Sequence, residues 1–268
     1  MRWLPCSNIP VLPLVDTHCH LLAGLDDGPR NEEDALTMFR MVYEEGVRHV
    51  CAVAHQNEQY PDVTPERIRT TAKQLSDSLR TANVALSVSP CAEVMVRPDL
   101  EAAWAAGRLM SVGDQGKYLL IEMPHGLAVD VGYLVCRLMR LGLRPILAHP
   151  ERSPELLADS ERVEELIRQG CLIQVSSGSV TDPPRWMGSK RLKEWFKRGL
   201  VHLIGSDGHS PRRRPPRLAD AYEQIRYWAG DAVADRVCST NGMLVLQGLP
   251  FNPPPPAKRR GWLSALWG

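Results

Sequence analysis

The chain has 268 residues, and its 32 Lys and Arg residues against 31 Asp and Glu residues give a formal net charge of +1. This length fits one large domain or two small ones, and a hydrophobic content of 44% is enough for a buried core. The near-neutral charge argues against a nucleic-acid-binding protein, because such proteins usually carry a clear basic excess.

Residues 1–13 are expected to form an N-terminal extension. They contain three prolines and lack the continuous apolar stretch of a signal peptide. Seven cysteines are scattered along the chain without a CxxC pair, which favours reduced thiols over a disulfide framework. No run approaches the ~18 apolar residues of a transmembrane helix. The sequence therefore predicts a cytoplasmic protein.

Apolar runs alternate with helical patterns between residues 14 and 248. Most runs are continuous, which is typical of strands buried on both faces of a parallel sheet. The expected strands cover residues 14–17, 47–54, 84–89, 118–123, 145–148, 171–176 and 201–205. Seven strand–helix units predict an α/β protein with one domain over residues 14–248, a distorted (β/α)7 barrel of TIM type. A doubly wound open sheet is the alternative.

Helix signals fill the gaps between these strands. Asn31 is a good N-cap for a helix running to about Glu45, because acidic residues occupy its first turn. Thr64 precedes a proline at the first helical position, which predicts a second helix start. Further helices are expected at 98–106, 130–141, 160–169, 187–198 and 217–229.

Side chains that bind metals follow almost every apolar run. The first run ends in a His-x-His pattern, and alternate residues of a strand share a face, so both imidazoles can bind one ion. The carboxyl ends of barrel strands converge on one face, where the active site lies, so we expect these side chains to meet. The nine candidate ligands are His18, His20, Asp27, His55, Glu93, Glu122, His149, Asp207 and His209.

Nine ligands are too many for one ion and suit two or three. Taken singly, each residue is more readily a hydrogen-bonded structural histidine or a helix-capping carboxylate. Their recurrence at the same position in six units favours a metal site. Imidazole and carboxylate donors suit Zn²⁺, Mn²⁺ or Fe²⁺, and clustered ions of this kind serve the hydrolysis of phosphate esters.

Three histidines lie outside this pattern. His49 and His202 fall within expected strands and are predicted to be structural. His125 follows the fourth strand closely enough to be a weaker candidate for a substrate contact.

Cys91 and Arg97 have the C-x5-R spacing of cysteine-dependent tyrosine phosphatases. The loop lacks the glycines that let backbone amides hold a phosphate, and Glu93 would repel one. Cys91 is therefore expected to be a buried structural thiol.

Several motifs resemble those of the PHP (polymerase and histidinol phosphatase) superfamily. The resemblance is greatest to the bacterial protein-tyrosine phosphatases encoded with capsule and exopolysaccharide genes. The matching segments include DTHCH from Asp16, LDDGP from Leu25, AHPER from Ala148 and GSDGH from Gly205. Together they are specific to this branch and span most of residues 14–248.

The resemblance implies the PHP form of the distorted barrel, with three divalent metal ions. Mn²⁺ is the expected metal, with Zn²⁺ or Fe as alternatives. By the resemblance, one ion would take His18, His20, Glu93 and Asp207. A second ion would take Glu93, Glu122 and His149. A third ion would take Asp27, His55 and His209.

The resemblance also places two arginines at the substrate phosphate. They are Arg152 of AHPER and Arg214, which precedes two prolines, and guanidinium groups suit phosphate oxygens. Arg212, Arg213 and Arg217 are expected to be solvated. Cys19, Gln56 and the loop after Ser179 depart from the family pattern and leave the substrate open.

These observations predict a metal-dependent phosphomonoesterase that hydrolyses phosphotyrosine in proteins and regulates capsule or exopolysaccharide synthesis. His209 is expected to take part in catalysis as well as in metal binding. The expected partner, by resemblance, is a bacterial tyrosine kinase of capsule synthesis. The alternatives are another PHP phosphoesterase, acting on histidinol phosphate or a small phosphate ester, and a regulatory PHP module without catalysis.

The last residues, 249–268, form a tail rich in proline that ends in basic residues and tryptophans. This composition predicts disorder. Contact with a membrane is expected only through the tail or a partner.

Overall fold

The computed structural model describes residues 12–124, 130–183 and 189–257. Its seven strands form one sheet, hydrogen-bonded in chain order, and every neighbouring pair is parallel. His125, expected near the substrate, lies outside the described residues. The strands are β1 (Leu14–His20), β2 (Val47–Gln56), β3 (Ser87–Met95), β4 (Tyr118–Glu122), β5 (Arg144–Ala148), β6 (Leu172–Ser176) and β7 (Leu203–Gly205).

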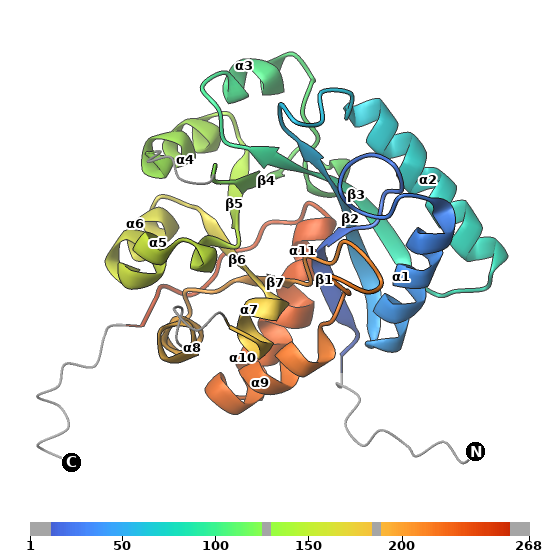
Figure 1. Cartoon of the computed structure of the whole chain (residues 1–268). Coiled ribbons are helices and arrows are strands. Elements are labelled where there is room, and N and C mark those ends of the chain that lie inside the picture. Colours follow the sequence, from blue (N-terminus) through green and yellow to red (C-terminus); the bar gives the residue numbers. More distant parts are fainter. Residues whose placement is uncertain (1–11, 125–129, 184–188, 258–268) are drawn as a thin grey trace, which may run out of the picture.

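The sheet closes on itself where β7 ends beside β1. The backbone N–H of Asp207 donates to the carbonyl of His18 at 2.7 Å, and the N–H of His20 donates to the carbonyl of Gly208 at 2.8 Å. The strands form a ring with helices around it (Figure 1). The predicted (β/α)7 barrel is confirmed, and the doubly wound open sheet is excluded.

The helices begin close to where the sequence places them. Asn31 accepts a hydrogen bond from the N–H of Asp34 at 2.9 Å, and Thr64 accepts one from Arg67 at 3.3 Å. No helix in the described ranges has the length and apolar composition needed to span a membrane. The helices are α1 (Glu32–Glu44), α2 (Pro65–Thr81), α3 (Leu100–Ala105), α4 (Val131–Arg140), α5 (Pro154–Ala158), α6 (Ser160–Arg168), α7 (Ser177–Thr181), α8 (Ser189–Arg198), α9 (Ala219–Ala229), α10 (Asp231–Asp235) and α11 (Asn241–Leu246), with shorter turns η1 (Val112–Asp114), η2 (Pro150–Arg152) and η3 (Arg236–Thr240).

Three strands extend further towards their carboxyl ends than predicted, and β2 runs to Gln56 instead of ending at residue 54. Strand β1 includes both histidines of the His-x-His pattern, and β3 runs through Pro90 to Met95 instead of ending at residue 89. Pro90 is tolerated because β3 pairs with β4 only from Glu93 onwards, so on that side Pro90 faces no ladder. Glu93 therefore lies within its strand and not after it.

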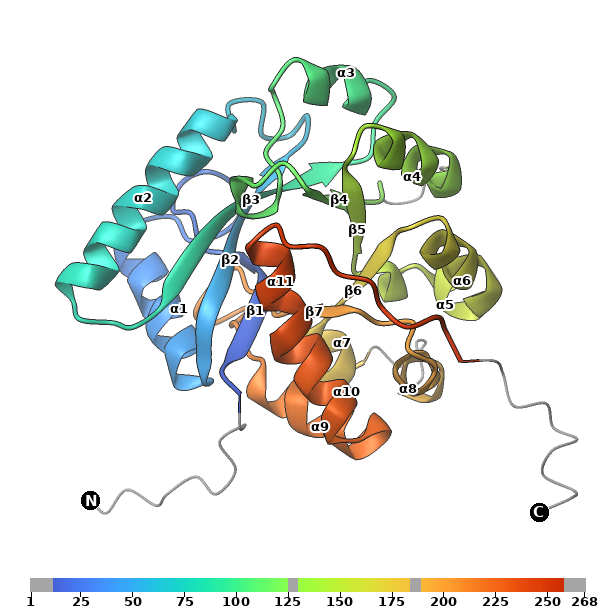
Figure 2. The same ribbon diagram turned by 180° about the vertical axis from the view of Figure 1, so that it is seen from behind.

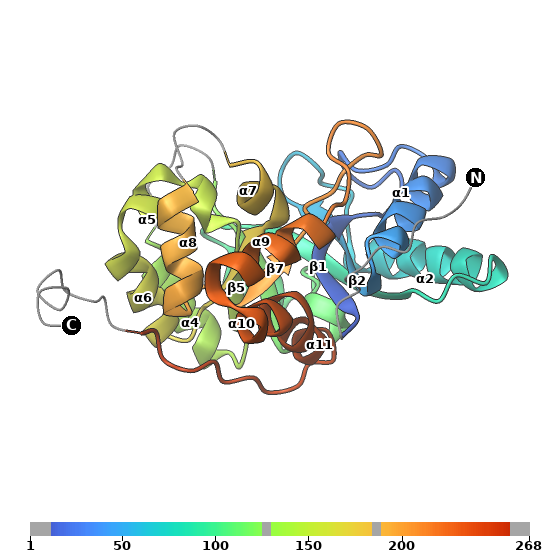
Figure 3. The same cartoon turned by 90° about the horizontal axis from the view of Figure 1, so that it is seen from below.

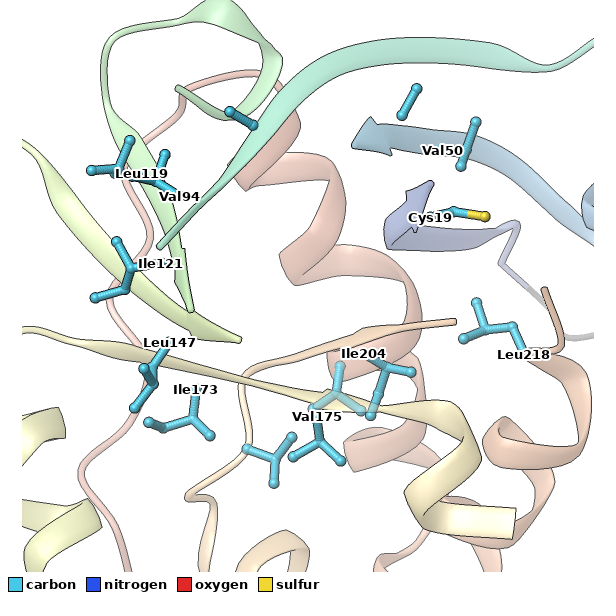
Figure 4. Close-up of a cluster of buried hydrophobic side chains, with 14 of the residues drawn as sticks. Cys19, Val50, Val94, Leu119, Ile121, Leu147, Ile173, Val175, Ile204 and Leu218 are labelled. Atoms are coloured by element: carbon cyan, nitrogen blue, oxygen red, sulfur yellow. The ribbon is translucent and has the colours of Figure 1, made fainter. Parts of the chain in front are cut away.

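The strands have apolar side chains on both faces, which explains their continuous hydrophobic runs. One face belongs to a buried cluster that also includes residues of the surrounding helices, and Figure 4 shows Val94, Leu119 and Leu147 of this cluster. Alternate residues, such as Cys51 and Leu120, form a second buried cluster inside the barrel. The inner faces of the strands thus form a filled core, on which a polar site can be built.

An irregularity in β1 determines which way its histidines point. Val15 belongs to the inner cluster and Cys19 to the outer one, although regular alternation would put residues four apart on the same face. The register between β1 and β2 shifts between Asp16 and Cys19, as in a β-bulge. This bulge turns His18 and His20 towards the inside of the barrel.

The chain after α11 packs against the end of the barrel opposite the loops that follow the strands (Figures 2 and 3). The phenol of Tyr118 donates to the carbonyl of Leu249 at 2.7 Å, and the side chain of Phe251 is buried in the inner cluster. The backbone N–H of Ala257 donates to Arg198 at 2.9 Å. Residues 249–257 therefore pack on the barrel, in contrast to the predicted disorder of the tail, and residues 258–268 lie outside the described residues.

We expect Phe251→Ala to lower the free energy of unfolding by about 3 kcal/mol, because it removes a buried aromatic ring. The control is Leu249→Ala, since Leu249 is 44% exposed and its side chain contributes little. Denaturant unfolding of both variants measures the difference. Equal stabilities of the two variants would show that this segment does not support the barrel.

Candidate metal centre

The carboxylate of Glu93 is the centre of the side-chain cluster at the barrel mouth. It is 1% exposed, and its Oε2 atom lies 3.3 Å from His18 Nε2, 3.4 Å from His20 Nε2 and 3.2 Å from His55 Nδ1. Its Oε1 atom lies 2.9 Å from His149 Nε2. Four imidazoles from β1, β2 and the end of β5 thus converge on one carboxylate of β3.

The first group of possible ligands lies at the seam between β1 and β7. The Nε2 atoms of His18 and His20 are 3.2 Å apart, and Asp207 Oδ1 is 3.7 Å from His18 Nε2. Four ligands around an ion with bonds of about 2.1 Å lie about 3.4 Å from one another. Together with Glu93, these three residues therefore have the spacing of a preformed metal site.

The second group lies on the other side of Glu93. His149 Nε2 is 3.7 Å from Glu122 Oε1, and both side chains are buried. Burial and the neighbouring Glu93 carboxylate raise the pKa of Glu122 to about 7. A bound cation would lower the pKa of Glu122 again, because it would stabilise the ionised forms of Glu93 and Glu122.

The third group opens towards solvent. Asp27 Oδ1 is 3.5 Å from both His55 Nε2 and His209 Nε2, and the Asp27 side chain is 48% exposed. The ring of His55 also turns its Nδ1 towards Glu93 and Glu122, so it lies between the second and third groups. All nine predicted ligands are thus brought together.

The cluster fits divalent metal ions on its own chemistry. His55 Nδ1 is a buried polar atom without a hydrogen-bond partner, although carboxylates surround it. Burial and the charge of His20 lower the pKa of His209 to about 3, so its ring is neutral and has a lone pair for a metal. Buried carboxylates in this number also need compensating positive charge.

Two ligand positions have a backbone that non-glycine residues seldom adopt. His149 has a φ of 33° and Asp207 a φ of 54°, and among the described residues other than glycine only Asn83 and Asp114 also have a positive φ. At the end of β5 this conformation turns the chain into η2, which carries Arg152. Such strain is common where a functional side chain must be aimed.

Asp26 supports this centre and was missed from the sequence, which favoured the next residue, Asp27. Its Oδ2 accepts hydrogen bonds from His20 Nδ1 at 2.7 Å and from the N–H of His55 at 2.9 Å. Burial opposes its charge, but His20 and these hydrogen bonds outweigh burial and lower the pKa of Asp26 to about 2. Its bond to the N–H of Gly28, two residues on, is an Asx-turn that the Asp-Asp-Gly pattern already suggests.

Two further contacts orient imidazoles towards the cluster. Gln174 Oε1 lies 2.8 Å from His18 Nδ1, and the carbonyl of Asp207 lies 2.9 Å from His209 Nδ1. Because these contacts engage Nδ1, they leave Nε2 available for a metal.

The two predicted arginines lie at the edge of the cluster. Each donates from Nη2 to Asp207 Oδ2 at 2.5 Å, and Arg152 also donates to Ser176 Oγ at 3.0 Å. The side chains of Arg152 and Arg214 are 36% and 44% exposed. Both guanidinium groups therefore remain accessible beside the possible metal sites.

An open cleft of about 740 Å³ leads away from this edge. It lies between the loops after β1 and β7, which Figure 3 shows near each other at one end of the barrel. The lining residues are Asp27, Gly28, Pro29, Arg30, Glu33, Asp34, Thr37, His209, Ser210, Pro211, Arg212, Arg213 and Arg214. Arg212 and Arg213 are exposed, as predicted, but they line the cleft.

The remaining predicted residues lie away from the centre. His202 Nδ1 accepts a hydrogen bond from the N–H of Ile173 at 2.9 Å, which confirms a structural role. His49 lies in the half of β2 remote from His55. Cys91 is fully buried, and burial raises the pKa of its thiol well above its usual value. Both features disfavour a thiolate nucleophile at Cys91 and agree with the structural role expected from the sequence.

Comparison with known proteins places this geometry in a family. Residues 14–247 match the CpsB/CapC family of capsular polysaccharide synthesis. The tyrosine-protein phosphatase YwqE of Bacillus subtilis is 29% identical over 253 residues, which cover 92% of this chain and 98% of the relative. The tyrosine-protein phosphatase CpsB of Streptococcus pneumoniae is 28% identical over 219 residues, which cover 79% of this chain and 89% of the relative.

The fold agrees with these sequence matches. A chain from the crystal structures of YwqE and CpsB, described as unique metal-dependent tyrosine phosphatases, matches with a TM-score of 0.84. It is 27% identical, and the match covers 92% of this chain and 100% of the other.

We expect Asp26→Asn to weaken binding of divalent metal by about 10-fold to 100-fold, because His20 loses the carboxylate that orients its ring. Competition with a chromophoric chelator measures the affinity. Asp62→Asn, which changes an exposed carboxylate in another loop, is the control. Unchanged affinity in the Asp26 variant would contradict a supporting role for this residue.

Proposed function

The chain belongs to the CpsB/CapC family of capsular polysaccharide synthesis proteins, and we propose that it is a metal-dependent protein-tyrosine phosphatase that regulates capsule or exopolysaccharide synthesis. The observation that carries this proposal is that Asp207 lies between the possible metal ligands and the two arginines. Its Oδ1 atom faces the imidazoles of His18 and His20, and its Oδ2 atom accepts from Arg152 and Arg214. A phosphate can therefore contact both guanidinium groups beside the metal cluster.

We propose three divalent ions, with Mn²⁺ as the expected metal and Zn²⁺ or Fe as alternatives. The ligand spacings support His18, His20, Glu93 and Asp207 for the first ion. They support Glu93, Glu122 and His149 for the second ion, and Asp27, His55 and His209 for the third. When bound, such ions supply Lewis acidity that activates water and offsets the charge of phosphoryl oxygens.

The chain's own residues hold and orient the phosphate. Ser176 and Asp207 fix one edge of the Arg152 guanidinium, and its other N–H groups remain free to donate to phosphoryl oxygens. Arg214 approaches the same carboxylate from the loop after β7. A phenolate leaving group, with a pKa of about 10, needs less protonation than an alkoxide. His209, next to Asp27, is the side chain proposed to assist at this step as well as to bind metal.

The proposed substrate is phosphotyrosine in a protein. The accessible edge of the cluster and the cleft beside it support a substrate attached to a polypeptide. A bacterial tyrosine kinase of capsule synthesis is the proposed partner, and the cytoplasm is the proposed location.

Prolonged dialysis against EDTA should abolish hydrolysis of a phosphotyrosine peptide, and Mn²⁺ should restore it, because buried imidazoles and carboxylates supply the site. Phosphate release and metal analysis on the same samples measure this. Cys91→Ser should keep near-normal turnover, since that thiol is buried away from the cleft. Full activity of metal-free protein would refute the proposed function, and a folded, metal-loaded but inactive Cys91 variant would reinstate a cysteine mechanism.

Arg214→Ala should lower kcat/KM for a phosphotyrosine peptide by ~10²–10³, because it removes a charged donor from the phosphate site. Metal content should stay the same. Arg217→Ala, an exposed arginine of the same loop that does not line the cleft, should cost far less. Equal losses in steady-state kinetics of the two variants would assign the effect to diffuse positive charge and not to Arg214.

A further inference from the structure

We propose that Arg212 and Arg213 select phosphotyrosine sites that have acidic residues next to the phosphotyrosine. This inference rests on the proposed phosphatase function and adds a sequence preference to it. The occupant is a peptide segment with carboxylates on one side of its phosphotyrosine.

The cleft places these two arginines where the flank of a bound peptide must lie. The lining of the cleft includes Asp27, His209 and Arg214, which belong to the proposed metal and phosphate sites. Arg212 and Arg213 line the same cleft. A peptide whose phosphate contacts Arg214 therefore brings its neighbouring residues to these guanidinium groups.

The loop after β7 holds the arginines at fixed positions. The Ser210 hydroxyl accepts hydrogen bonds from the N–H groups of Arg213 and Arg214, each at 3.1 Å. The carbonyl of Arg214 accepts from the N–H of His209 at 2.8 Å. The turn is thus closed by its own hydrogen bonds, which fix the backbone position of Arg213 beside Arg214.

The positive charge of Arg212 and Arg213, on the wall of the cleft formed by the loop after β7, is available to a ligand. Among the described residues, no carboxylate pairs with Arg212 or Arg213, and both side chains are exposed. In contrast, Arg30 on the other wall lies 3.9 Å from Asp34. Unpaired guanidinium groups in a cleft attract carboxylates and steer their approach.

The opposite wall of the cleft should restrict the preference for acidic residues to one flank of the phosphotyrosine. Glu33, near the start of α1, lines the cleft and is exposed. Its carboxylate repels acidic residues that would lie along α1, whereas the loop after β7 attracts them. Acidic residues should therefore favour hydrolysis on one flank of the phosphotyrosine and not on both.

The test uses the full-length, Mn²⁺-loaded chain and three peptides that differ only beside the phosphotyrosine. One has two aspartates before it, one has two aspartates after it, and one has serines on both sides. We expect kcat/KM for one aspartate peptide to exceed that for the serine peptide by about fivefold, mainly through a lower KM. Raised ionic strength should reduce this ratio, because exposed charges are screened.

The double variant Arg212→Ser/Arg213→Ser should bring the ratio close to one, and Arg217→Ser should leave the ratio intact. Equal hydrolysis of all three peptides by the unmodified chain would overturn the selectivity and leave the phosphatase function standing. A ratio that persists in the double variant, or that is lost with Arg217→Ser, would also overturn it. Failure of the folded, metal-loaded chain to hydrolyse any of the peptides would overturn both proposals.

Discussion

The burial of Glu93 is the constraint on which the rest of the site depends. Its carboxylate is 1% exposed and lies within 3.4 Å of four imidazoles. Glu122 and Asp207 lie in the same buried region, and charges held so close together in a low-dielectric environment cannot all be ionised without cations between them. The convergence of strands in a barrel creates this crowding, and divalent metal ions are the natural means of relieving it.

The barrel achieves this arrangement with simple strand alternation and one exception. In β2, β3 and β4 the inward apolar residues Val53, Cys91 and Leu120 are each followed, two positions later, by a polar residue of the cluster: His55, Glu93 and Glu122 respectively. Strand β1 needs a bulge to turn its histidines inwards. The seam with β7 must also be tight, because a Cβ atom on Gly205 would lie 2.3 Å from His18 Cβ. Gly205 is therefore needed for close packing against His18, a proposed metal ligand.

Much of this could be predicted from the sequence, because continuous apolar runs mark buried parallel strands and strand ends converge. Asp26 could not be distinguished from Asp27 by residue type, since the choice depends on which side chain reaches His20. The bulge in β1, between Asp16 and Cys19, leaves no sign in the sequence. Phe251 was assigned to a disordered tail because local composition does not reveal its burial in the cluster that includes Tyr118 and residues of α11.

In the proposed site, Asp207 connects the metal ligands to the substrate-binding arginines through its two oxygen atoms. Oδ1 is 3.7 Å from both His18 Nε2 and His209 Nδ1, whereas Oδ2 accepts both arginines at 2.5 Å. Its left-handed backbone conformation is maintained by the hydrogen bond of its N–H to His18 across the barrel seam. The position of Arg152 and Arg214 is thus tied to the closure of the barrel itself, and any change that opens the seam between β1 and β7 must disturb the proposed metal and phosphate sites together.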